Sequence, residues 1–290
     1  MQILFHLGAH CTDDGLLIRS VLRNRAVLAN EGIGVPGPSR YRELLGDVST
    51  TLRGEQASED TEQMLVDAIR DDDTAERIVL SSENFICRDK VVLSEDGLYS
   101  KAGKSAWLRN CFPSHDVEFA IAIRNPASFI PDVLARLPEN ERDEVFTSFR
   151  LETASWADVI ADISAANPGA PISVWCHEDT PFIWAELIRE LTAHDPYTVT
   201  EGGLDMIAQI MSETGFARLQ DFLNGHSDLT ESQRRRTISA FLEAHALKDE
   251  IENEVDLPGW TRDTVDVLSE LYEEDLRQIS KMSGVTFVQP

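Results

Sequence analysis

Two histidines, a cysteine and two aspartates crowd into one short stretch near the start of the chain: His6, His10, Cys11, Asp13 and Asp14. Imidazole, thiol and carboxylate groups bind metals and move protons. A divalent metal held among them would attract a phosphate group. The spacing matches no established metal motif, however, and neighbouring aspartate side chains diverge. We therefore expect no metal at this stretch.

The elements around this stretch favour a different ligand. Residues 3–7 are apolar and end at Gly8, which predicts a short buried strand followed by a loop. Leucines and valines at helical spacing then predict a helix over 15–30. A strand, a glycine-containing loop and a helix in succession form the arrangement that wraps backbone N–H groups around a phosphate.

Strand and helix signals alternate along the rest of the chain. Further strands are predicted over 77–85, 117–126, 171–179 and 284–288. Further helices are predicted over 61–70, 100–111, 127–137, 149–166, 182–193, 204–224, 230–254 and 261–282. The alternation predicts an α/β fold, a mostly parallel sheet flanked by helices. We expect one domain over 1–290, with an α/β core over 1–200 and a mainly helical part over 201–290 packed on it.

Polar residues follow the predicted strands where ligands bind in open parallel sheets, at the carboxyl ends. The second strand ends in two serines and Glu83, and the third ends in Arg124. Glu83 is the candidate general base, because a carboxylate there could take a proton from a hydroxyl group. Two other roles remain open for Glu83: capping a helix, or pairing with Lys101 or Lys104.

Charge and composition limit the partners. The chain carries 26 Lys and Arg against 51 Asp and Glu, a net charge of −25. Such a chain repels nucleic acid and anionic membranes, although one local basic pocket could hold a small anion. We see no secretory signal and no apolar run near the roughly 20 residues that span a bilayer, so we expect a cytoplasmic protein. The scattered cysteines are expected to be reduced thiols: Cys11, Cys87, Cys111 and Cys176.

Several short motifs occur together in one known family. The loop reads His6-Leu-Gly-Ala-His-Cys-Thr-Asp-Asp-Gly15, and later strands end in Ser81-Ser82-Glu83 and Arg124-Asn-Pro126. These runs resemble the sulfotransferase family, particularly its bacterial members, whose loop reads His-x-Gly-x-x-Lys-Thr-Gly-Thr-Thr. The resemblance implies a P-loop-like fold of the sulfotransferase type. It also implies transfer of a sulfonyl group from phosphoadenosine phosphosulfate (PAPS) to a hydroxyl or amine acceptor.

The resemblance also assigns roles to residues. The loop that would cradle the 5′-phosphosulfate consists of Gly8, Ala9, His10, Cys11, Thr12, Asp13, Asp14 and Gly15. Arg124 would hold the 3′-phosphate together with a serine, whose position is occupied by Asp132. His10 fits the family loop and is a second catalytic candidate beside Glu83.

Four positions depart from the family pattern in a way that opposes phosphate binding. Cys11 replaces the lysine, Asp13 and Asp14 replace small residues, and Asp132 replaces the serine. A carboxylate about 4 Å from a phosphate oxygen costs about 4 kcal/mol at an effective dielectric constant of about 20. One interpretation is a protein that has lost PAPS-dependent activity and binds another molecule or a protein partner.

The other interpretation is a working sulfotransferase with PAPS as cofactor and an unknown small-molecule acceptor. It would draw its cation from elsewhere, for instance from Arg19, Lys101, Lys104 or a metal.

Overall fold

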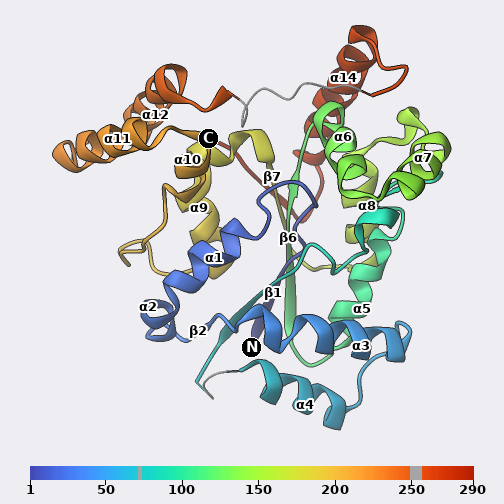
Figure 1. Cartoon of the computed structure of the whole chain (residues 1–290). Helices are drawn as coiled ribbons and strands as arrows, with labels where there is room; N and C mark the ends of the chain where they lie inside the picture. Colours follow the sequence, from blue (N-terminus) through green and yellow to red (C-terminus); the bar gives the residue numbers. More distant parts are fainter. Residues whose placement is uncertain (71–73, 249–256) are drawn as a thin grey trace.

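The computed structural model describes residues 1–70, 74–248 and 257–290, which build a six-stranded sheet in the order β2-β3-β1-β6-β7-β8 (Figure 1). Each neighbouring pair in this sheet is parallel. The strands are β1 (Gln2–His6), β2 (Ile33–Gly34), β3 (Arg77–Ser81), β6 (Asp116–Ile123), β7 (Ile172–Cys176) and β8 (Val285–Val288). A separate antiparallel pair joins β4 (Leu93–Ser94) and β5 (Gly97–Leu98). The predicted α/β fold with a mostly parallel sheet is confirmed.

The central strands are buried on both faces, which explains their nearly continuous apolar sequences. Ile3 and Phe5 of β1 point into the larger core, whereas Leu4 points into the smaller core on the opposite face. The smaller core contains Trp175 and Trp184, and the larger contains Trp156. These three tryptophans are buried.

Helices cover both faces of the sheet (Figure 1). Those of the first part are α1 (Leu16–Arg23), α2 (Arg25–Ala29), α3 (Arg42–Leu52), α4 (Glu59–Ile69), α5 (Ser105–Asn110), α6 (Pro126–Arg136), α7 (Glu139–Ser148), α8 (Trp156–Ala166) and α9 (Thr180–Thr192). Those of the last part are α10 (Asp205–Ile210), α11 (Glu213–Gly225), α12 (Glu231–His245) and α14 (Arg262–Ile279). None of the described helices has the length and apolar character to cross a membrane.

The last part of the chain divides between two places. Helices α10, α11 and α12 surround a small cluster of their own, made of Ile207, Met211, Leu219 and Ile238. Helix α14 instead packs on the larger core through Leu268, Tyr272 and Ile279, and β8 pairs with β7 at the sheet edge. The region over 201–290 therefore contributes a strand and a core helix to the α/β part.

Several predicted boundaries are wrong. The helix predicted over 15–30 breaks at Asn24, whose side-chain amide donates to the carbonyl oxygens of Ser20 and Glu201. The helix predicted over 204–224 breaks at Met211, which forms an antiparallel bridge with Ala246.

Other helices start or end elsewhere than predicted. The same bridge ends α12 at His245, so the prediction of a continuous helix over 230–254 is wrong at Ala246 and Leu247. Residues 249–254 of that prediction lie outside the described ones. Helices α3 and α7 have no predicted counterpart, and the helix predicted over 149–166 begins only at Trp156.

Candidate functional site

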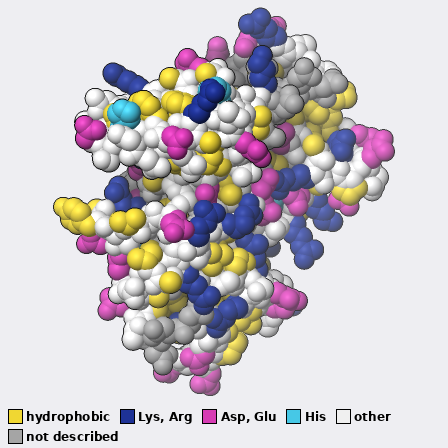
Figure 2. Space-filling model, turned by 60° about the vertical axis from the view of Figure 1, so that its left-hand side comes forward, with side chains coloured by type: hydrophobic (Ala, Val, Ile, Leu, Met, Phe, Trp, Pro, Cys, Tyr) yellow, Lys and Arg dark blue, Asp and Glu magenta, His cyan; other side chains and the backbone are white. Residues whose placement is uncertain are grey.

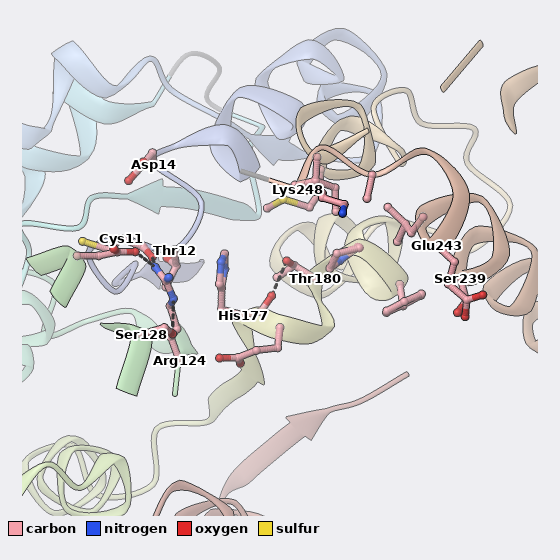
Figure 3. Close-up of a pocket in the computed structure, with 18 of the residues that line it drawn as sticks. Cys11, Thr12, Asp14, Arg124, Ser128, His177, Thr180, Ser239, Glu243 and Lys248 are labelled. Atoms are coloured by element: carbon pink, nitrogen blue, oxygen red, sulfur yellow. Dashed lines mark hydrogen bonds and ion pairs between the residues drawn. The ribbon is translucent and has the colours of Figure 1, made fainter. Parts of the chain in front are cut away.

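The carboxyl ends of β1, β6 and β7 meet at a cavity of about 930 Å³ (Figure 3). The loop after β1 supplies Cys11, Thr12 and Asp14 to its wall, and Arg124 comes from the end of β6. Helices α6, α9, α10 and α12 complete the wall. The cavity thus lies where parallel sheets bind ligands, and it is within the size range of small-molecule sites.

The loop after β1 is closed by its own hydrogen bonds. Thr12 Oγ1 donates to the carbonyl oxygen of Ala9 over 2.6 Å. Asp13 Oδ2 accepts from the backbone N–H of Leu17 over 2.8 Å, so this carboxylate caps the start of α1. A carboxylate at a helix N-terminus occupies the place that an anionic ligand would take. Asp13, which was predicted to contact the cofactor, therefore has a hydrogen-bond partner within the chain.

Backbone strain marks the same loop. Cys11 and Asp14 have φ values of 55° and 48°, in the left-handed region that non-glycine residues rarely adopt. Gly8, with φ of 52°, packs against the backbone of Glu83. Burial raises the pKa of the Cys11 thiol to about 12, so this side chain is uncharged at pH 7.

Arg124 joins three segments of the site. Its guanidinium is nearly buried, and Nη1 donates to the carbonyl oxygen of Cys11 over 2.6 Å. The same nitrogen lies 2.7 Å from Asp132 Oδ2, and Nε donates to Ser128 Oγ over 3.1 Å. The carbonyl oxygen of Arg124 accepts from the indole of Trp156. The structure thus brings Arg124 and Asp132 together, as ion-pair partners of each other.

Arg136, at the end of α6, is a site residue that the sequence analysis missed. It pairs with Asp14, and its Nη1 lies 3.3 Å from Glu83 Oε2 and 3.8 Å from Asp89 Oδ1. A signal for it existed, because Ser128, Asp132 and Arg136 recur at helical spacing and share one face of α6. Arg136 therefore supplies the positive charge that pairs with Asp14.

The two catalytic candidates lie apart from the cavity. Glu83 forms part of a second, smaller pocket and is held by Arg136. His10 is fully buried, and Tyr99 Oη lies 2.8 Å from both its backbone nitrogen and its Nδ1. Burial lowers the pKa of His10. Ala9, predicted to contact the cofactor, is also buried.

His177 is a further residue on the cavity wall, and Figure 3 shows its ring between Thr12 and Lys248. Burial, followed by the nearby charge of Arg124, lowers the pKa of His177 to about 4, so the ring is neutral at pH 7. Its Nδ1 has no hydrogen-bond partner among the described residues. The preceding Cys176 belongs to the core, so the pair does not share a face, as strand alternation predicts.

The other cations considered from the sequence lie elsewhere. Arg19 donates to the carbonyl oxygen of Asp14 at the rim of the loop. Lys104 lies over the ring of Trp107, 4.5 Å from its centroid, and neither Lys104 nor Lys101 lines the cavity. Within the described parts of the chain, no three His, Cys, Asp or Glu side chains are grouped to hold a metal.

Comparison of the chain with family models, curated proteins and solved structures finds no match. The sulfotransferase expectation therefore depends on the loop and strand-end motifs.

Proposed function

We propose that this chain is a sulfotransferase-like binding protein that does not use PAPS. The observation that carries the proposal is the ion pair between Arg124 and Asp132, with 2.7 Å between Nη1 and Oδ2. If the family alignment holds, Arg124 is the residue that would bind the 3′-phosphate. Its charge is instead neutralised by a carboxylate of the chain.

The loop supports the same conclusion independently. Asp13 caps α1 and Asp14 pairs with Arg136, so both carboxylates are held in place by the chain. A ligand phosphate entering this loop would have to displace them or tolerate their charge, and it would find an uncharged thiol at Cys11. Nucleotide binding would then be disfavoured at both places where the resemblance puts a phosphate, at Arg124 and in the loop.

The cavity nevertheless retains the features of a binding site. One side carries Thr12 and the neutral ring of His177. The opposite side carries four apolar side chains, Phe182, Met206, Ile210 and Leu242, together with the polar Ser239, Glu243 and Lys248. Apolar walls with a few polar groups are typical of small-molecule sites. We infer that the ligand is a small molecule with an apolar body and a hydrogen-bonding group, without a phosphate.

Calorimetric titration with adenosine 3′,5′-bisphosphate, the desulfated product of PAPS, tests this proposal. The wild-type chain is expected to give no binding heat with ligand at millimolar concentration, and adenosine serves as the phosphate-free control. A dissociation constant in the micromolar range would overturn the proposal.

A second candidate function is a working sulfotransferase, and one observation favours it. Arg136 contacts both Asp14 of the loop and Glu83, the candidate base. A guanidinium at this position could replace the missing lysine during sulfonyl transfer. Transfer from radiolabelled PAPS to a panel of acceptors would support this candidate if it is lost in Arg136→Gln and Glu83→Gln. Absence of transfer to any acceptor would count against it.

A further inference from the structure

Helices α11 and α12 form a hairpin at one side of the molecule (Figure 1). The chain enters and leaves this hairpin through one short bridge, in which Met211 pairs antiparallel with Ala246. Beside the bridge, the backbone N–H of Ser212 donates to the carbonyl oxygen of His245 over 2.9 Å. Because the two connections lie side by side, a turn of the hairpin about the bridge changes few backbone contacts.

Helix α10, just before the bridge, is fixed to the α/β core. Met206 of α10 lies in the smaller core. Asp205 accepts from Ser20 Oγ over 2.6 Å, and its Oδ1 lies 3.0 Å from Arg23 Nη1, so α10 is joined to α1. The bridge thus separates a helix that the core holds from a hairpin that extends beyond it. Hinges occur at such ends of secondary-structure elements.

Two cavities adjoin the contact between the hairpin and α9. The large cavity has Leu242 of α12 in its wall, and a further cavity of about 480 Å³ has Ile238 of α12. Phe182 of α9 lines both cavities. In Figure 2, where the hairpin side of the molecule comes forward, a hollow separates the upper part of the surface from the part below it. Protein interiors contain few voids larger than a water molecule, so a contact flanked by two cavities holds the hairpin loosely.

One ion pair joins the hairpin to α9. Arg235 Nη2 lies 3.1 Å from Glu186 Oε1, and the two side chains are 24% and 25% exposed. Glu231 of α12 competes for the same guanidinium, with its Oε1 3.5 Å from Arg235 Nε. Among the described residues, no other ion pair connects the hairpin with the rest of the chain. Partly exposed ion pairs contribute little free energy and are screened by salt, so this contact can break and form again.

The hairpin carries one wall of the large cavity. Ser239 and Glu243 of α12 belong to this wall, and Figure 3 shows them across the cavity from Thr12 and Arg124. The opposite wall belongs to the α/β core, because it comes from the loop after β1 and from the end of β6. A turn of the hairpin therefore moves one wall relative to the other and changes the width of the cavity.

We propose that the α11–α12 hairpin is a lid on the large cavity, which turns about the Met211–Ala246 bridge and is held closed by the ion pair between Arg235 and Glu186. An open lid admits a ligand, and a closed lid shields the ligand from water. The lid regulates access to the site of the proposed function, so the proposal rests on that site but not on the identity of its ligand.

Pulsed electron paramagnetic resonance between two nitroxide labels tests the proposal without any ligand. One label is placed on Asp228→Cys, in the turn between α11 and α12, and the other on Tyr197→Cys, in the loop after α9. Both positions are exposed, Tyr197 by 93%. Three of the native cysteines are buried, and a Cys87→Ser background removes the fourth.

The wild type should give a main, closed distance and a minor, longer one. Arg235→Gln removes the ion pair, and the ratio of open to closed molecules should rise about two- to fivefold, as expected for a partly exposed pair. Glu186→Gln breaks the same pair from the side of α9 and should give the same rise. Arg236→Gln, at an exposed arginine of the same helix, is the matched control and should leave the ratio unchanged.

An unchanged distance distribution in both Arg235→Gln and Glu186→Gln would overturn the proposal, as would an equal rise in Arg236→Gln. If far-UV circular dichroism shows that Arg235→Gln loses helix, Glu186→Gln decides, because it leaves the sequence of α12 unaltered. The measurement contains no nucleotide, so the lid and the proposed function can fail separately: the labels test the lid, and the adenosine bisphosphate titration tests the function.

Discussion

Arg124 Nη1 lies 2.7 Å from Asp132 Oδ2 and, at the same time, 2.6 Å from the carbonyl oxygen of Cys11. One guanidinium group thus connects the end of β6, the loop after β1 and the middle of α6. The same contacts that stabilise the site leave this nitrogen without capacity for a ligand. The ion pair and the hydrogen bond to the loop therefore use both N–H groups of this nitrogen for structural support.

The free energy of unfolding should depend more on Arg124 than on its ion-pair partner Asp132. Asp132→Ser leaves Arg124 with the Cys11 carbonyl and the Ser128 hydroxyl, so we expect a loss of about 1 kcal/mol. Arg124→Ala removes every contact of a nearly buried group and should cost about 2–3 kcal/mol. Urea denaturation measures both values. Equal losses would contradict the role of Arg124 as the connecting group.

The loop aspartate that caps α1 should contribute to stability as an ordinary helix cap does. Asp13→Ala removes the acceptor of the Leu17 N–H and should lower the free energy of unfolding by about 1 kcal/mol. Asp13→Asn keeps a side-chain oxygen at the same place and serves as the control, with a smaller loss expected. If thermal unfolding shows no difference between alanine and the wild type, Asp13 is not a cap in solution.

The crossing of α11 and α12 should tolerate no added methyl group at Gly215. A Cβ at this position would lie 2.3 Å from Cβ of His245, whereas one at Gly225 would meet nothing within 4 Å. Gly215→Ala should therefore destabilise the α11–α12 pair by about 1–3 kcal/mol, and Gly225→Ala should not. Hydrogen exchange is the measurement, with faster exchange expected in α11 and α12 only. Equal protection in the two variants would show that the helices do not cross here.

Acid should destabilise the folded chain through its buried histidines. The pKa of His177 is lowered to about 4, mainly by burial, so between pH 6.5 and 4 the unfolded chain binds a proton that the folded chain does not. The contribution of His177 to stability is therefore present above pH 6.5 and lost as the pH falls towards 4. His177→Gln should show a smaller loss over this range by urea denaturation at several pH values. The wild type and the variant share the opposing effect of acid on the charge of −25, so that effect cancels in the comparison.

The sequence predicted which segments meet at the site, because the carboxyl ends of parallel strands share one edge. It placed Arg124 beside Asp132 through the motif, and both lie in the wall of the cavity. It did not predict that Arg136 reaches the loop, since that depends on how α6 packs. The burial of His10 behind the loop could not be predicted either, because a loop sequence does not tell which side chains face the ligand.

Helix limits were predictable where local chemistry sets them. Ser58 accepts from the backbone N–H of Thr61 at the start of α4, close to the start of the helix predicted over 61–70. The break at Asn24 depends on a hydrogen bond to Glu201, and the break at Met211 depends on its bridge with Ala246. Contacts between residues distant in the chain cannot be deduced from periodicity.

The most direct test of the central claim is to remove the two carboxylates and measure nucleotide binding. The double variant Asp14→Thr/Asp132→Ser replaces each carboxylate by a hydroxyl next to Arg136 and Arg124. Calorimetry with adenosine 3′,5′-bisphosphate should then detect binding in the double variant and none in the wild type. Micromolar binding by the unaltered chain, or no gain on replacing both aspartates, would contradict the claim that these carboxylates occupy the places of the ligand's phosphates.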